Sequence, residues 1–214
     1  MIYVSHLTPW QHYQQDLTRE DFSHDVAQEQ AVKQLQRVYD DLIALNTKGS
    51  RNKLFSFFGK KSQPSVQGLY LWGGVGRGKT YLMDTFFDAL PGDKKLRAHF
   101  HRFMHQLHHD LAALQGQRDP LVSIAKEMAA KYQVICFDEF FVSDITDAML
   151  LGTLFESLFA EGVALVATSN IIPDELYRNG LQRARFLPAI AAINKHCDIL
   201  NVDSGVDYRL RTLE

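Results

Sequence analysis

The sequence predicts a doubly wound α/β fold, in which a mainly parallel sheet lies between two layers of helices. Short apolar runs alternate with segments of helical spacing along most of the chain. Several runs are continuously apolar, which is typical of strands buried on both faces of a parallel sheet. Glycine-rich or acidic residues directly follow two of the runs, at the carboxyl ends where such sheets bind ligands. The five expected strands span residues 68–72, 97–103, 133–137, 162–168 and 197–202.

Composition and charge are those of an ordinary globular domain. The chain has 214 residues, of which 46% are hydrophobic and 22% charged, so it is long enough to bury a sizeable core. A net charge of -2 and a sequence pI near 6.5 indicate no strong attraction to nucleic acid. The first residues lack the pattern of a secretory leader, and no run reaches the length of a membrane span, so we expect a cytoplasmic protein.

The residues before the first expected strand divide into three parts. Residues 1–24 are polar and aromatic without a period and predict an N-terminal arm, while residues 25–214 form the expected core domain. Apolar residues at helical spacing predict a helix over 25–45, with Asp25 as its N-cap. A linker over 48–66 then precedes the strand.

The linker combines lysine, arginine and phenylalanine without any acidic residue. Basic residues interleaved with aromatic ones can contact an anionic membrane or a single-stranded nucleic acid. A solvated linker with a hydrophobic clip is the favoured interpretation. A weak membrane contact through residues 51–61 is the alternative.

The stretch after the first expected strand reads GGVGRGKT and carries the strongest functional pattern in the chain. A GxxxxGKT loop between a strand and a helix is a P-loop, in which backbone N–H groups at the helix start bind phosphate. Lys79 is placed to reach the β and γ phosphates, and the Thr80 hydroxyl to ligate Mg²⁺. The expected nucleotide-binding residues are Gly73, Gly74, Val75, Gly76, Arg77, Gly78, Lys79 and Thr80.

Asp138 and Glu139 follow the apolar run 133–137 and complete the expected catalytic site. Asp138 would join the Mg²⁺ shell, and Glu139 would orient or deprotonate the attacking water. A water-directed glutamate favours hydrolysis over phosphoryl transfer to a second substrate. Asn170 ends the next expected strand and would contact the γ phosphate. Sequence alone leaves open whether the strands that carry Lys79 and Asp138 are neighbours or have a strand between them.

Five histidines, two cysteines and a Phe-Met pair have structural as well as functional interpretations. The spacing of five histidines permits a zinc site, but no cysteine or carboxylate cluster completes it, so packing and hydrogen bonding are favoured. Phe103-Met104 is either a substrate-gripping pore loop or part of the core. The cysteines Cys136 and Cys197 lie in apolar runs and are expected to be small buried hydrophobes. The five histidines are His99, His101, His105, His108 and His109.

Several further stretches are more particular than a generic P-loop. They are HFHRFM, CFDEFFVSDITDAMLL, LVATSN, PDELYRNGLQRARFLPAI and NVDSGVDYRLR. Together with GLYLWGGVGRGKT they resemble the AAA+ ATPases of the ZapE-like family, whose eukaryotic members are mitochondrial. The resemblance covers residues 25–213 and implies a P-loop NTPase with an AAA+ core, five parallel strands in the order 5-1-4-3-2, and ATP as the nucleotide.

The same resemblance implies roles for individual residues. Lys79 and Thr80 match Walker A, Asp138 and Glu139 match Walker B, and Asn170 matches sensor 1. The GLQR stretch places Arg183 as an arginine finger, with Arg185 as the second candidate. In bacteria, the family implies a role at the division ring with FtsZ, and self-association of the full-length protein into a ring.

The chain departs from the AAA+ pattern after the fifth expected strand. A small helical lid with a sensor 2 arginine normally follows, whereas this sequence ends at Glu214. We therefore expect the C-terminal lid to be absent. The terminal Leu-Glu is also what a cloning site leaves behind, so we expect a truncated chain.

The expected function is Mg²⁺-dependent ATP hydrolysis that remodels a protein partner, with FtsZ as the candidate. One alternative is a DNA-linked AAA+ protein of the initiator or helicase-loader kind, which the acidic balance of the chain disfavours. The other is a scaffold that binds nucleotide only as a switch, which the presence of Glu139 disfavours.

Overall fold

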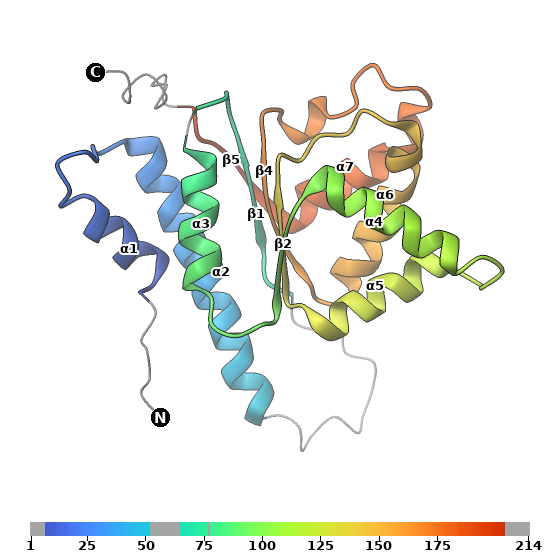
Figure 1. Ribbon diagram of the computed structural model, residues 1–214, viewed down its shortest axis with the longest axis horizontal. Helices are drawn as coiled ribbons and strands as arrows, with labels where there is room; N and C mark the ends of the chain where they lie inside the picture. The colour runs from blue at the N-terminus through green and yellow to red at the C-terminus, as the bar shows by residue number, and fades with distance from the viewer. Residues whose placement is uncertain (1–6, 52–64, 77, 204–214) are drawn as a thin grey trace.

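The computed structural model describes residues 7–51, 65–76 and 78–203. Within them, five parallel strands form one sheet in the order β2-β3-β4-β1-β5 (Figure 1). The strands are β1 Gly68–Trp72, β2 Lys95–His99, β3 Val134–Asp138, β4 Ala164–Ser169 and β5 Cys197–Asn201. Counted from the other edge, this confirms the expected order 5-1-4-3-2. β4 lies between β1 and β3, which answers the question that the sequence left open.

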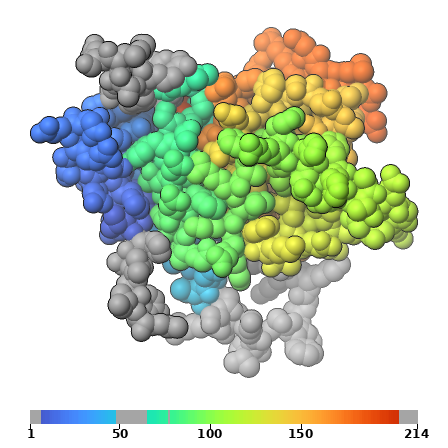
Figure 2. Space-filling view, in the orientation of Figure 1, coloured from blue at the N-terminus to red at the C-terminus, as the bar shows by residue number. Residues whose placement is uncertain are grey.

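Helices cover both faces of the sheet (Figure 1). One face carries α1 Pro9–Asp16, α2 Val26–Arg51 and α3 Lys79–Ala89. The other carries α4 Phe100–Ala113, α5 Pro120–Lys131, α6 Ile145–Ala160 and α7 Leu187–His196. Two 3-10 turns, η1 Pro173–Glu175 and η2 Arg183–Arg185, lie between β4 and α7. In the space-filling view, α1 and α3 pack on one side of the molecule and the segment that carries η1 and η2, coloured orange, lies on the other (Figure 2).

The sheet separates two hydrophobic clusters. In β3, Cys136 packs on the side of α1–α3, while Ile135 and Phe137 pack on the side of α4–α7. Since side chains alternate between the faces of a strand, one continuous apolar run supplies both clusters. Cys136 and Cys197 are buried free thiols, and burial raises the pKa of each. They therefore serve as neutral, buried hydrophobes.

The N-terminal arm contains a helix that the sequence pattern did not predict. A capping box starts α1: Thr8 Oγ1 accepts from Gln11 N at 3.3 Å, and Gln11 Oε1 accepts from Thr8 N at 2.9 Å. Tyr13 is fully buried in the cluster formed with α2 and α3. A helix this short depends on its cap and its packing rather than on its own period. The expected cap of α2 is confirmed, because Asp25 Oδ1 accepts from Ala27 N at 2.7 Å.

α2 continues to Arg51, past the expected helix end at residue 45. The first residues of the expected linker 48–66 are therefore helical. Residues 52–64 lie outside the described part of the chain, so both interpretations of the linker stay predictions. None of the helices in the described ranges is long and apolar enough to cross a membrane.

The boundary between β2 and α4 differs from the expected one. β2 ends at His99 and α4 begins at Phe100, so the strand expected over 97–103 is wrong in its second half. The sequence there alternates in polarity, yet three apolar residues also lie at helical spacing. Phe100, Phe103 and Met104 are all buried. Phe103 and Met104 thus belong to the core, the second of the two interpretations that the sequence left open.

The histidines around this boundary take separate structural positions. The expected strand 97–103 would have placed His99 and His101 on one face, but His99 ends β2 and His101 lies in α4. His108 Nε2 lies 2.7 Å from Asp147 Oδ1 and joins α4 to α6. Asp144 caps the N-terminus of α6. Among the residues that the structure describes, no three His, Cys, Asp or Glu side chains are arranged to hold a metal ion.

Gly68 allows β1 to enter the sheet between β4 and β5. A Cβ at this position would lie 2.0 Å from Leu165 O and 3.1 Å from Cys197 Sγ. The first distance is far below van der Waals contact with a backbone atom that the sheet holds in place. Because β1 leads directly into the P-loop, a shift of β1 would move the loop as well.

We predict that Gly68→Ala lowers the midpoint of thermal unfolding. Over-packing a close-packed site costs about 1–3 kcal/mol, and each kcal/mol corresponds to roughly 2–4 °C for a chain of this size. The matched control is Gly152→Ala in α6, where the new Cβ would lie 3.4 Å from Pro188 Cβ and alanine favours the helix. Melting curves by circular dichroism compare the two. An unchanged midpoint for Gly68→Ala would contradict the tight contact.

Candidate nucleotide-binding and hydrolysis site

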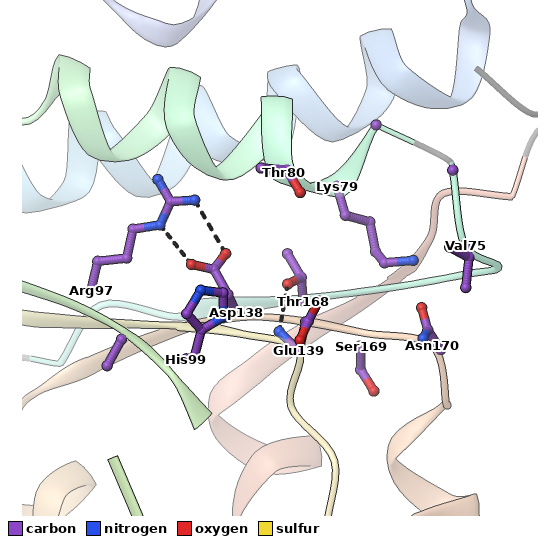
Figure 3. A pocket seen from close by; sticks show the side chains of 13 residues that line it. Val75, Lys79, Thr80, Arg97, His99, Asp138, Glu139, Thr168, Ser169 and Asn170 are labelled. Carbon is purple, nitrogen blue, oxygen red and sulfur yellow. Dashed lines mark hydrogen bonds and ion pairs between the residues drawn. The ribbon is translucent and has the colours of Figure 1, made fainter. Parts of the chain in front are cut away.

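One cavity at the carboxyl ends of the strands gathers most of the expected site residues (Figure 3). Its volume is about 560 Å³. The expected residues that line it are Val75, Gly76, Gly78, Lys79, Thr80, Asp138, Glu139 and Asn170. Sequence reasoning did not predict the others, which are Arg97, Ala98, His99, Thr168 and Ser169. Residues more than 90 positions apart are therefore brought together where parallel sheets bind ligands.

The P-loop passes from β1 into α3 through two left-handed glycines. Gly76 has φ 78° and Gly78 has φ 75°, in a region that glycine occupies at little cost. Gly73 N donates to Ser169 O at 3.2 Å, which fixes the start of the loop beside β4. α3 begins directly after Gly78, and a helix N-terminus attracts anions. Arg77 lies outside the described residues.

The Lys79 ammonium is folded back onto the P-loop. Its Nζ donates to Gly73 O at 2.6 Å and to Gly74 O at 2.7 Å. The charge is thus held within the loop that would surround phosphate groups. A charged phosphate oxygen accepts stronger hydrogen bonds than a neutral carbonyl. Lys79 is therefore placed to exchange a carbonyl partner for a phosphate oxygen.

Asp138 and Glu139 end β3 in contrasting environments. Asp138 is 9% exposed, whereas Glu139 is exposed. Glu139 has φ 56°, a left-handed conformation that costs a non-glycine residue about 1–2 kcal/mol. The turn is held by β4, because Glu139 N donates to Thr168 Oγ1 at 3.3 Å and Phe140 N donates to Thr168 O at 2.7 Å. Strain maintained in this way is common at functional sites, and here it presents a carboxylate to the cavity.

Asn170 follows β4 and is exposed at the rim of the cavity. Its neighbours are anchored: Ser169 Oγ donates to Phe140 O at 2.7 Å and accepts from Ile171 N at 3.1 Å. Tyr70 OH donates to Ile171 O at 2.8 Å. Burial raises the pKa of Tyr70, so this hydroxyl stays a donor. The Asn170 amide consequently projects from a fixed segment of backbone.

Arg97 of β2 is the cavity residue with the strongest contacts that sequence reasoning missed. Its Nε lies 2.7 Å from Asp138 Oδ2 and its Nη2 lies 3.3 Å from Asp138 Oδ1. Its Nη1 lies 2.5 Å from Asp84 Oδ1 on α3. Burial acts to lower the pKa of Arg97, but the hydrogen bonds to the two carboxylates outweigh it and raise that pKa. The available sequence signal was an arginine at the start of the strand expected over 97–103, since a charge that becomes partly buried requires a counter-charge.

The side chains of the cavity fit a magnesium nucleotide. Mg²⁺ is bound by oxygen ligands, commonly one or two protein groups together with substrate phosphates. Thr80 and Asp138 supply a hydroxyl and a carboxylate beside the P-loop. Lys79 and the N-terminus of α3 supply positive charge for the phosphates. The arrangement accordingly suits a bound phosphate chain and its metal ion.

Arg183 and Arg185, the candidate arginine fingers, do not line this cavity. Arg183 Nη2 donates to Asp174 O at 2.6 Å, and its Nε is buried without a hydrogen-bond partner among the described residues. Arg185 is exposed, and its Nη1 donates to Gln182 Oε1 at 3.2 Å. Their action on a neighbouring subunit stays a prediction.

Sequence similarity to known proteins covers nearly the whole chain. The AFG1-like ATPase family matches residues 7–214. Cell division protein ZapE of Escherichia coli K12 is 57% identical over 97% of this chain and 57% of its own length. Lactation elevated protein 1 homolog B of Danio rerio is 46% identical over 69% of this chain and 32% of its own length. The chain thus spans less than two thirds of the length of these curated relatives.

Structural similarity extends to AAA+ proteins of distant sequence. AMPPCP-bound DnaA from Aquifex aeolicus superposes with a TM-score of 0.57 at 14% identity, over 91% of this chain and 52% of that chain. At this identity the likeness shows a shared fold alone. The sheet order and the cavity agree with a P-loop AAA+ core. Together with the sequence matches, these observations show that the chain belongs to the AFG1-like ATPase family.

Proposed function

We propose that this chain binds ATP with Mg²⁺ and hydrolyses the nucleotide. The observation that carries the proposal is the convergence of the P-loop, Asp138, Glu139 and Asn170 on one cavity. Membership of an ATPase family supports the same reaction. The AMPPCP bound to DnaA, a protein with the same fold, supports the choice of an adenine nucleotide.

Five side chains of the cavity have roles in this proposal. Lys79 and the N-terminus of α3 bind the phosphates, and the Asn170 amide contacts the γ phosphate. Thr80 and Asp138 hold Mg²⁺, which when bound offsets negative charge on the phosphate oxygens. Glu139 orients the attacking water or accepts its proton, since its carboxylate is presented by the turn after β3.

We further propose that hydrolysis drives the remodelling of a protein partner. The support is the similarity to ZapE, whose name assigns that protein to cell division, and FtsZ is the candidate partner in a cytoplasmic setting. A DNA-linked role would require strongly salt-dependent DNA binding, which a net charge of -2 disfavours. A scaffold that only binds nucleotide would have no use for Glu139 in the cavity.

The first functional prediction separates binding from hydrolysis. Lys79→Ala should weaken ATP binding by roughly tenfold or more, because a hydrogen bond to a charged group is worth about 1.5–3 kcal/mol. Glu139→Gln should keep the affinity but lower turnover by about 10²–10⁴, the contribution of a general base. Calorimetry with Mg²⁺-ATP measures binding, and phosphate release measures turnover.

The controls are Lys126→Ala and Glu156→Gln, which change exposed residues of α5 and α6 outside the cavity. Both should bind and hydrolyse ATP as the unmodified protein does. Equal loss of ATP binding in Lys79→Ala and Glu139→Gln would contradict the separate roles.

The second functional prediction is that Arg183 acts on the ATP of a neighbouring subunit in a ring of the full-length protein. An arginine that contacts the transferring phosphoryl group is worth about 10³–10⁵ in rate. Full-length Arg183→Ala and Glu139→Gln should each be inactive alone, while their mixture regains activity. In mixed rings, an Arg183→Ala subunit keeps its glutamate, and its Glu139→Gln neighbour supplies the arginine.

Arg178→Ala is the matched control, because Arg178 lies in the same segment and forms an exposed ion pair with Glu175 at 2.8 Å. It should remain active alone. Light scattering first shows that the variants assemble. If rings that are shown to be mixed recover no activity, or if Arg183→Ala alone is nearly normal, Arg183 is not the finger. Arg185 then undergoes the same mixing experiment.

A further inference from the structure

Arg97 forms an ion pair with Asp138, the carboxylate that the proposed function assigns to the metal ion. Its guanidinium faces both oxygens of Asp138, at 2.7 Å through Nε and at 3.3 Å through Nη2 (Figure 3). The side chain of Asp138 is only 12% exposed and that of Arg97 is 22% exposed, so water screens this pair less than it would at the surface. The pairing supplies the counter-charge that a carboxylate buried at the end of β3 requires.

A metal ion at Thr80 and Asp138 would therefore share its carboxylate with a second cation. An arginine and a divalent ion on one carboxylate repel each other, and the repulsion is strong where the site is partly dry. Either the ion binds against this repulsion or Arg97 moves away from Asp138. In both cases, the charge of Arg97 raises the Mg²⁺ concentration that the site requires.

Asp84 offers Arg97 an alternative partner. It lies on α3 one helical turn after Thr80, and residues four apart on a helix share a face. Its Oδ1 already accepts from Arg97 Nη1 at 2.5 Å. Its side chain is 51% exposed, more than four times the 12% of Asp138. A guanidinium released from Asp138 can thus keep a counter-charge through a small rotation rather than move into water.

We propose that Arg97 is a positioning residue. Its guanidinium holds Asp138 before Mg²⁺-ATP binds, and it then keeps Asp84 as its partner when Asp138 turns to the metal ion. Asp84 and Arg97 together set how much Mg²⁺ is needed for nucleotide binding. The inference rests on the proposed binding of Mg²⁺-ATP at this cavity. It assigns functions to two residues that no motif of the chain includes.

The experiment measures the affinity for AMPPCP, by calorimetry, from EDTA through a series of MgCl₂ concentrations. The Mg²⁺ midpoint is the MgCl₂ concentration at which the gain in AMPPCP affinity is half complete. Arg97→Met removes the competing charge, so this midpoint should fall by roughly three- to tenfold, the scale of one unit charge near a divalent cation in a partly wet site. Asp84→Asn removes the alternative partner, so the midpoint should rise by about threefold on the same scale. Arg97→Lys restores the charge and should return the midpoint most of the way to that of the unmodified protein.

Two matched controls make the same changes of charge at positions that do not contact Asp138 or Arg97. Asp88→Asn changes an exposed carboxylate one turn further along α3, and Arg102→Met changes an exposed arginine of α4. Neither residue lines the cavity, so both controls should keep the Mg²⁺ midpoint. Melting curves confirm that each variant is folded. If Arg97→Met does not fold, the exposed position 84 still tests the proposal.

The outcomes separate three explanations. Opposite shifts in Arg97→Met and Asp84→Asn support competition for Asp138. A higher Mg²⁺ midpoint in Arg97→Met would mean that Arg97 only orients Asp138 for the metal, and it would overturn the proposal. Lower stability with unchanged midpoints would show a structural role and also overturn it. If the unmodified protein itself fails to bind AMPPCP with Mg²⁺, the proposed function fails first.

Discussion

Hydrogen bonds from the end of β4 to both neighbouring strands are the constraint on which the site depends. Ser169 O accepts from Gly73 N at the start of the P-loop, and Ser169 Oγ donates to Phe140 O after the acidic pair. Thr168 accepts from Glu139 N and Phe140 N. Two adjacent residues of one strand thereby fix the P-loop against the acidic turn. This is possible only because β4 lies between β1 and β3.

Electrostatics adds a second constraint, because carboxylates and cations lie close together in and beside the cavity. Among the described residues that line the cavity, the carboxylates of Asp138 and Glu139 lie with the cations of Lys79 and Arg97. Asp84, outside the lining, contacts Arg97. Lys79 is held by carbonyls, whereas Arg97 spans two of the carboxylates. Arg97 is the counter-charge that offsets the burial of Asp138, and in our proposal the same cation opposes a metal ion there. That proposal couples the stability of the unliganded site to its metal affinity through one side chain.

The parts of the molecule that the sequence predicted are those governed by short-range patterns. The P-loop, the acidic pair and the buried strands each follow from a few consecutive residues, whereas the strand order came from a family resemblance. The second half of the strand expected over 97–103 was wrong, because Phe100 and Phe103 fit both a strand and a helix and are buried in α4. α1 was missed because its stability comes from a cap and from the burial of Tyr13. The Arg97–Asp138 contact depends on the pairing of β2 with β3, which no local pattern contains.

The arrangement of arginines bears on how one chain could complete its catalytic site. Of the described lysines and arginines, those that line the cavity are Lys79 and Arg97, and Arg97 faces carboxylates. Under the proposed function, charge that develops on the γ phosphate would need a further cation, for which Arg183 and Arg185 are the candidates. Tyr177 OH donates to Leu181 O at 3.0 Å within this segment, and Arg183 donates to the Asp174 carbonyl. These contacts hold the segment in place away from the cavity, so under the proposed function either arginine would act on the nucleotide of a neighbouring subunit.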